Sequence, residues 1–261
     1  MSVFQRFVLM IWLLAAPIAV FAQDPKCPIP GDWKFVPEFS DEFNGSKLDP
    51  GKWDPFNPSW KGRAPGWFSR ENVAVKDGSL QLTARVEHVP NIPKRYHTFT
   101  TAAVKSKERV CYGYFEVRFR PMNSKASSSF WFYASDQDLW TEIDVFELCG
   151  AHPSMGSTFY MNVHVFITPE DGKKHWNKGS EWVAPYRFAD DYHVAGLLWT
   201  KDKIEWFVDG VSRFSLKNTH WHQKLNVNFD SETMPKWFGL PEPAELPSTF
   251  YIDYIRCWKT R

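Results

Sequence analysis

The 261-residue sequence has no excess of charge of either sign and few cysteines. Its 31 basic and 30 acidic residues give a formal net charge of +1, so no strong field draws the chain to nucleic acid or to an anionic membrane. The four cysteines include no Cys-x-x-Cys spacing, which argues against a zinc site. We therefore expect neither a nucleic-acid partner nor a stable association with a membrane.

Long apolar runs are also absent, except at the start of the chain. Arg6 precedes an apolar run over residues 7–21 that ends in the pattern Ala-x-x-Ala. This arrangement, with a core too short to span a bilayer well, is typical of a secretory signal peptide. We expect residues 1–22 to be removed and residues 23–261 to form a single domain that is secreted, periplasmic or bound at the cell surface. The alternative is an uncleaved membrane anchor.

An exported chain favours disulfide bonds, because it folds in an oxidising compartment. Cys27, Cys111, Cys149 and Cys257 permit three pairings. We favour Cys27–Cys257, which lie near the two mature termini, together with Cys111–Cys149.

Helical periodicity is scarce, and strand patterns take its place. Short runs of β-branched and aromatic residues recur at about ten-residue spacing between turn residues. Two Asp-Gly pairs, Asp77-Gly78 and Asp209-Gly210, predict hairpin turns. This pattern predicts an all-β, two-sheet sandwich of jelly-roll type, and a closed barrel is the less favoured alternative. Strands are expected at 72–75, 79–84, 102–106, 112–120, 128–133, 142–148, 160–166, 193–199, 203–208, 224–229 and 249–258.

The sequence is rich in aromatic residues. They make up 17% of the chain and include fourteen tryptophans. Most are expected to fill the core, but fourteen tryptophans exceed what a core of this size needs. Aromatic faces also suit the C–H faces of sugar rings, so the surplus indicates a carbohydrate partner.

Three carboxylates, Glu142, Asp144 and Glu147, lie within six residues of one predicted strand. Strict alternation places Glu142 and Asp144 on one face and Glu147 on the other. A single β-bulge between Asp144 and Glu147 returns Glu147 to the face of the other two acids. Without the bulge, a charged side chain would enter the sandwich interior at a large energetic cost. We therefore predict a bulge and an open cluster of three acids.

Such a cluster suits glycoside hydrolysis. Neighbouring carboxylates raise one another's proton affinity, so one can stay protonated while another is ionised. A retaining glycosidase uses that asymmetry between two carboxyl groups about 5–5.5 Å apart. A solvated cluster of surface acids is the alternative interpretation.

The segment Glu-Ile-Asp-Val-Phe-Glu at 142–147 matches the bulged catalytic signature of family 16 glycoside hydrolases, and the chain resembles this family over nearly all of residues 33–259. The resemblance implies a curved jelly-roll sandwich whose concave face is the substrate cleft. It also implies a two-step retaining reaction with Glu142 as nucleophile, Glu147 as general acid/base and Asp144 hydrogen-bonded to Glu142. Further matching segments, in chain order, are 40–45, 72–83, 112–116, 130–131, 191–193, 206–210 and 252–256.

Five other residues are candidates for substrate binding, with ordinary packing as the alternative for each: Arg63, Trp67, Trp131, Trp140 and His164. Arg63 and Trp67 lie in a predicted Gly- and Pro-rich loop, where they offer a cation and an aromatic platform. Trp131 lies on a strand expected to neighbour the acids. His164 occupies the strand after the signature, where the family often places a polar substrate contact.

Within the family, the segments 60–66 and 228–232 look most like β-agarases and β-porphyranases, which act on red-algal galactans. The segments 220–226 and 140–141 are similar to κ-carrageenases, and a β-1,3-glucan is a further alternative substrate. The resemblance thus implies an endo-acting hydrolase of β-linked galactans. A sulfated galactan would need cations near the cleft, for which the candidates are Lys61, Arg63, Lys125 and His222.

Two other classes of function stay open: a transglycosylase and a carbohydrate-binding module without catalysis. The intact acid cluster argues against the binding module. We expect a monomer with a polysaccharide as its partner and no cofactor for catalysis. The resemblance implies a structural calcium ion in parts of the family, with Asp253 as the matching ligand.

Overall fold

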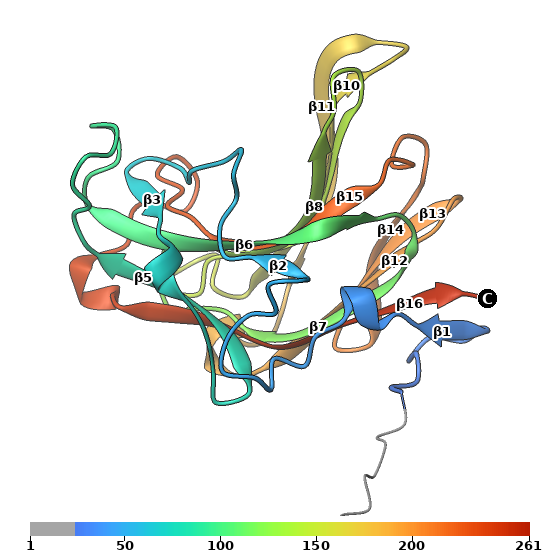
Figure 1. Cartoon of the computed structure of the whole chain (residues 1–261), viewed down its shortest axis with the longest axis horizontal. Helices are drawn as coiled ribbons and strands as arrows, with labels where there is room; N and C mark the ends of the chain where they lie inside the picture. Colours follow the sequence, from blue (N-terminus) through green and yellow to red (C-terminus); the bar gives the residue numbers. More distant parts are fainter. Residues whose placement is uncertain (1–23) are drawn as a thin grey trace, which may run out of the picture.

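The computed structural model describes residues 24–261, so the predicted signal peptide lies outside the described residues. The long strands form one antiparallel path that folds into two curved layers (Figure 1). The first layer contains, in spatial order, β11 (Gly172–Val183), β10 (Thr158–Thr168), β9 (Trp140–Leu148), β8 (Ser128–Ser135), β15 (Leu225–Ser231) and β6 (Phe99–Val110). The second continues with β5 (Ser79–Val86), β16 (Ser248–Thr260), β7 (Gly113–Arg120), β12 (His193–Trp199), β13 (Lys203–Val208) and β14 (Val211–Lys217).

Short elements complete the two layers. The strands β1 (Trp33–Phe35), β2 (Trp53–Asp54), β3 (Gly66–Phe68) and β4 (Val73–Lys76) pair with longer strands at their margins. The helical elements are the 3-10 turns η1 (Pro37–Phe39), η2 (Arg70–Asn72), η3 (Phe188–Asp190) and η4 (Pro243–Glu245). Over residues 24–261, no helix has the length and apolar character needed to cross a bilayer.

Aromatic side chains fill the space between the layers. Phe146 of β9 stacks on Phe119 of β7 with ring centroids 4.2 Å apart, and Phe130 stacks on Phe229 at 4.9 Å. Burying a side chain of this size contributes about 1.5–3 kcal/mol. Several tryptophans serve the same core, including the buried Trp199, Trp206 and Trp221.

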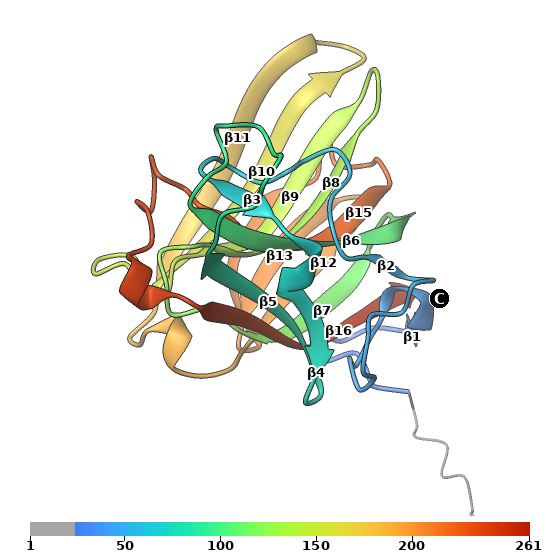
Figure 2. The ribbon, with the colours of Figure 1, turned by 60° about the vertical axis from the view of Figure 1, so that its left-hand side comes forward.

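The structure confirms the all-β sandwich, and each strand expected from the sequence is present. Asp77 and Gly78 have φ angles of 53° and 73°, and Asp209 and Gly210 have 49° and 77°. These positive values are those that a two-residue hairpin turn requires. The strands β11 and β14 were not among those expected. β11 is an edge strand with mostly exposed side chains, so it lacks the apolar alternation that marks a buried strand, and with β10 it forms a hairpin that extends beyond the sandwich (Figure 2).

The predicted disulfide pairing is wrong, because all four cysteines are free thiols in the structure. Cys257 points into the core between the layers, whereas Cys27 packs beside Trp258 on the opposite side of β16. Cys111 and Cys149 are each engaged elsewhere. The Cys111 thiol donates to the carbonyl of His222 at 3.5 Å, and the Cys149 thiol donates to the carbonyl of Ser124 at 3.8 Å.

The strand β9 contains the predicted bulge. Asp144 pairs with Trp131 of β8 and Phe146 pairs with Phe130, so Val145 is the extra residue without a partner on β8. The register with β10 shifts at the same place. Val145 and Phe146 both enter the core, and Glu147 returns to the side of Glu142 and Asp144. Burial of these apolar side chains therefore fixes the direction of the acids.

Two tryptophans from outside the first layer hold the backbone of this strand. The indole of Trp206, on β13, donates across the core to the carbonyl of Asp144 at 2.9 Å. The indole of Trp221 donates to the carbonyls of Glu142 at 2.8 Å and His164 at 3.1 Å. A bulge disrupts the ladder locally, and the Trp206 bond satisfies a buried carbonyl at that point.

We predict that Trp206→Phe destabilises the protein by about 1–3 kcal/mol, because the Asp144 carbonyl loses its donor while remaining buried. The turnover number should fall as well, since the acids lose part of their support. Urea unfolding and initial rates measure the two effects. The control is Trp176→Phe, because the Trp176 indole donates no hydrogen bond to any residue that the structure describes. Equal losses in the two variants would contradict the role of the Trp206 bond.

Candidate active site

A cavity of about 390 Å³ opens on the outer face of the first layer. Side chains from β8, β9, β10 and β15 and from the loop before β3 form its wall. Acids and aromatic rings dominate the lining, which consists of Ser59, Trp60, Arg63, Ser129, Trp131, Tyr133, Trp140, Glu142, Asp144, Glu147, Phe166, Asp230, Glu232 and Met234.

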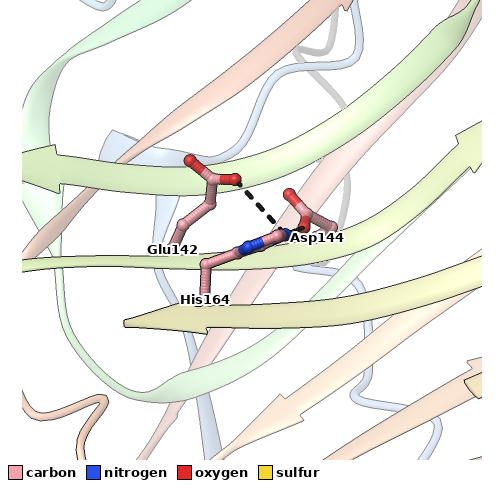
Figure 3. A group of neighbouring side chains, drawn as sticks. All are labelled: Glu142, Asp144 and His164. Atoms are coloured by element: carbon pink, nitrogen blue, oxygen red, sulfur yellow. Dashed lines mark ion pairs between the residues drawn. The ribbon is translucent and has the colours of Figure 1, made fainter. Parts of the chain in front are cut away.

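The three carboxylates of β9 all reach this cavity. The Glu142 side chain is 17% exposed and that of Asp144 is 6% exposed, so both are accessible only from the cavity. Figure 3 shows these two acids on either side of the His164 ring. Their arrangement supports the predicted open cluster, which depends on the bulge at Val145.

His164, on β10, contacts the acids from the neighbouring strand. Its Nε2 lies 3.2 Å from Oδ2 of Asp144 and 3.9 Å from Oε1 of Glu142 (Figure 3). Its Nδ1 lies 3.1 Å from Nε2 of His175, which is on β11. His164 therefore contacts the acid pair and does not line the cavity, whereas the sequence suggested a direct contact with substrate.

Burial dominates the electrostatics of the cavity. It raises the pKa of Glu142 well above the ordinary value, and repulsion from Asp144 and Glu147 adds to this effect. Burial likewise raises the pKa of Glu147 well above its usual range, with further repulsion from Asp144 and only partial relief from Arg63. The cavity therefore favours retention of protons by its glutamates, as a general acid requires.

Two further acids, Asp230 and Glu232, line the same cavity and were missed as site residues. Asp230 accepts a hydrogen bond from the Trp131 indole at 2.9 Å. Glu232 accepts from the Trp60 indole and, at 3.2 Å, from Nε of Arg63. Burial raises the pKa of both carboxyls. The alternation of acids at 230 and 232 was the available signal, because it directs both side chains to one face.

The predicted binding residues divide into two groups. Arg63, Trp131 and Trp140 line the cavity, and Trp140 stacks on Phe166 with centroids 4.6 Å apart. Trp67 lies outside the lining and packs edge-on against Tyr96, with centroids 4.9 Å apart.

Three of the cations proposed for a sulfated substrate also lie outside this cavity. Lys61 sits over the ring of Phe56, and Lys125 lies 3.7 Å from Glu245. His222 shares a hydrogen bond of 2.8 Å with the hydroxyl of Tyr112.

Asp253, the candidate calcium ligand, is already paired. Its Oδ2 accepts a hydrogen bond from the Arg118 guanidinium at 2.6 Å. This pairing engages one of the two carboxylate oxygens, and a calcium ion at Asp253 stays a prediction. Within residues 24–261, the one close group of three ligating side chains is Glu142 and Asp144 of the acid cavity with His164 beside them.

Comparison with known proteins places this site in a family. A family model described as the GH16 domain of β-porphyranases A–D matches residues 33–260. The chain belongs to glycoside hydrolase family 16. It is therefore a glycoside hydrolase, and the resemblance stated from the sequence is confirmed.

Individual members of the family are similar over most of the chain. β-Porphyranase B of Zobellia galactanivorans is 30% identical over 99% of this chain and 98% of its own length. β-Porphyranase D of the same organism is 30% identical over 90% of this chain, which spans 62% of that relative. The crystal structure of porphyranase B from Z. galactanivorans superposes with a TM-score of 0.77 at 28% identity, covering 92% of this chain and 97% of the other.

We predict that Glu142→Gln and Glu147→Gln each raise the melting temperature at pH 8, by about 2–4 °C for a loss of repulsion worth on the order of 1 kcal/mol. A carboxyl whose pKa is raised by folding stabilises the fold at low pH, and this stability is lost as the pH rises through the raised pKa. The glutamine amide does not ionise, so the variants avoid this loss of stability at pH 8. Their advantage in melting temperature should disappear near pH 4, where the wild-type carboxyls are protonated.

Thermal unfolding at the two pH values measures the difference. Glu170→Gln, at an exposed acid in the turn between β10 and β11, is the matched control. A lower melting temperature for both cavity variants at pH 8 would show that the ionised acids stabilise the fold.

Proposed function

We propose that the protein is a secreted, endo-acting, retaining hydrolase of β-linked red-algal galactans of the porphyran or agarose type. The observation that carries the proposal is the bulge at Val145, which brings Glu142 and Glu147 into one cavity lined by aromatic rings. Membership of the β-porphyranase domain family supports the substrate class.

In the first step, the ionised Glu142 attacks the anomeric carbon, and the bond to the leaving oxygen breaks. Glu147 donates its proton to that oxygen, so the raised pKa of its carboxyl suits this role. Asp144 lies beside Glu142, and His164 approaches both carboxylates from β10. These neighbours surround the nucleophile on the side of β10.

In the second step, Glu147 is ionised and removes a proton from water. The water oxygen attacks the anomeric carbon, and the bond to Glu142 breaks. The configuration of the sugar is retained because the carbon is inverted twice. Trp131 and Trp140 line the same cavity and offer faces on which sugar rings stack.

Incubation with porphyran, agarose, κ-carrageenan and laminarin, with assay of new reducing ends, tests the proposal. We expect cleavage of porphyran or agarose, and a loss of about 10³-fold or more in Glu142→Gln, because the amide is a poor nucleophile. The exposed-acid control Glu170→Gln should keep wild-type rates. Cleavage of laminarin alone would refute the substrate class, and full activity in Glu142→Gln would refute the nucleophile.

We predict that azide restores part of the activity of Glu147→Ala, because this small anion fits the space left by the carboxylate and attacks the sugar held on Glu142. The product should be a glycosyl azide that keeps the configuration of the substrate. Proton NMR of the first wild-type products provides the complementary measurement. An inverted anomer there would exclude the two-step reaction.

A further inference from the structure

A second cavity, of about 330 Å³, lies beside the acid cavity. The two share Ser59 and Tyr133 in their linings, so they adjoin, and we refer to the pair as the groove. The second cavity contains no carboxylate in its lining. Its charged residues are the two cations Lys105 and Arg109, both on β6.

The register of the first layer relates these cations to the catalytic acids. One row of paired residues across β9, β8, β15 and β6 contains Glu142, Tyr133, Asn226 and Arg109. The next row contains Asp144, Trp131, Asn228 and Lys105. Neighbouring strands lie about 4.8 Å apart, so β6 is about 14–15 Å from β9. A polysaccharide that spans these rows therefore reaches the acids and the cations together.

The charges on β6 are only partly balanced. Nη1 of Arg109 lies 2.9 Å from both carboxylate oxygens of Asp136, and Lys107 lies 3.9 Å from Asp54. Lys105 forms no ion pair with any residue between 24 and 261. Burial, together with repulsion from Arg109, lowers the pKa of the Lys105 ammonium. An anion in this cavity would relieve that repulsion.

The two cavities have opposite preferences for an anionic group. Five carboxylates line the first cavity, where Arg63 is already engaged by Glu232. A negatively charged substituent is repelled there. At the β6 end of the groove it meets the Lys105 ammonium, which forms no ion pair with a residue in the described range, and the Arg109 guanidinium, which Asp136 and Asn226 engage through Nη1 and Nε and whose Nη2 forms no hydrogen bond there.

We propose that Lys105 and Arg109 form a subsite for a sulfate ester on a galactan bound across the acids. This inference rests on the proposed function and narrows it to galactans that carry sulfate. Sulfate oxygens accept charge-assisted hydrogen bonds from ammonium and guanidinium groups. The wall shared with the acid cavity, formed by Tyr133 and Ser59, contacts the sugars between the two ends.

The test compares the double variant Lys105→Gln/Arg109→Gln with Lys107→Gln, a same-strand variant outside both cavities. The values of kcat and KM are measured on porphyran and on the same polymer after chemical desulfation. In wild-type enzyme, the preference for sulfate is the kcat/KM on porphyran divided by the kcat/KM on the desulfated polymer. The double variant should lower this ratio by on the order of 10-fold, mainly through a higher KM for porphyran. Lys107→Gln should leave the ratio within about twofold of wild type. The conservative variant Lys105→Arg should keep most of the preference.

Binding to the inactive Glu142→Gln protein distinguishes the source of the anion. Calorimetry with a sulfated galactan oligosaccharide, its desulfated form and a uronate-containing oligosaccharide should rank the sulfated form first. Equal affinity for the uronate would overturn the sulfate assignment. An unchanged ratio in the double variant, with wild-type enzyme that cleaves porphyran, would overturn the subsite and leave the proposed function intact. Wild-type protein that cleaves no galactan would instead refute the proposed function itself.

Discussion

The structure of the site depends on one extra residue in β9. Val145 and Phe146 both bury their side chains between the layers, which no regular strand permits for consecutive residues. The resulting bulge is maintained by the core on one side and by the Trp206 indole on the Asp144 carbonyl. Hydrophobic burial in the core thus supplies the force that keeps Glu147 in the same cavity as Glu142.

The gathered acids repel one another, and the surrounding groups determine how that repulsion is tolerated. Indole and guanidinium donors reach the outer acids Asp230 and Glu232, and the His164 ring reaches Asp144. Glu142 and Glu147 are left with charged neighbours of their own sign and a buried position, which raises the pKa of both carboxyls. The same repulsion that destabilises the folded protein therefore favours a pair that keeps one proton, which Glu147 holds while Glu142 is ionised.

Much of this arrangement could be predicted from the sequence, because the cost of burying a charge is a local constraint. The pattern at 142–147 required a bulge, and the alternation of strands required a sandwich. The register between distant strands is not local, so the positions of Asp230, Glu232 and Lys105 relative to the acids became clear only in the structure. The cysteine pairs failed for a related reason, since sequence proximity to the termini does not reveal which side of β16 a thiol faces.

The sheet also separates charge of opposite sign along one groove. Two strands, β8 and β15, lie between the acids of β9 and Lys105 of β6, and Trp131 and Tyr133 of β8 stand in that interval. A sulfate placed beside Glu142 would oppose ionisation of the nucleophile, whereas at β6 it is distant and partly neutralised. Strand spacing thus allows one surface to bind an anionic polymer and still perform chemistry that requires an ionised carboxylate.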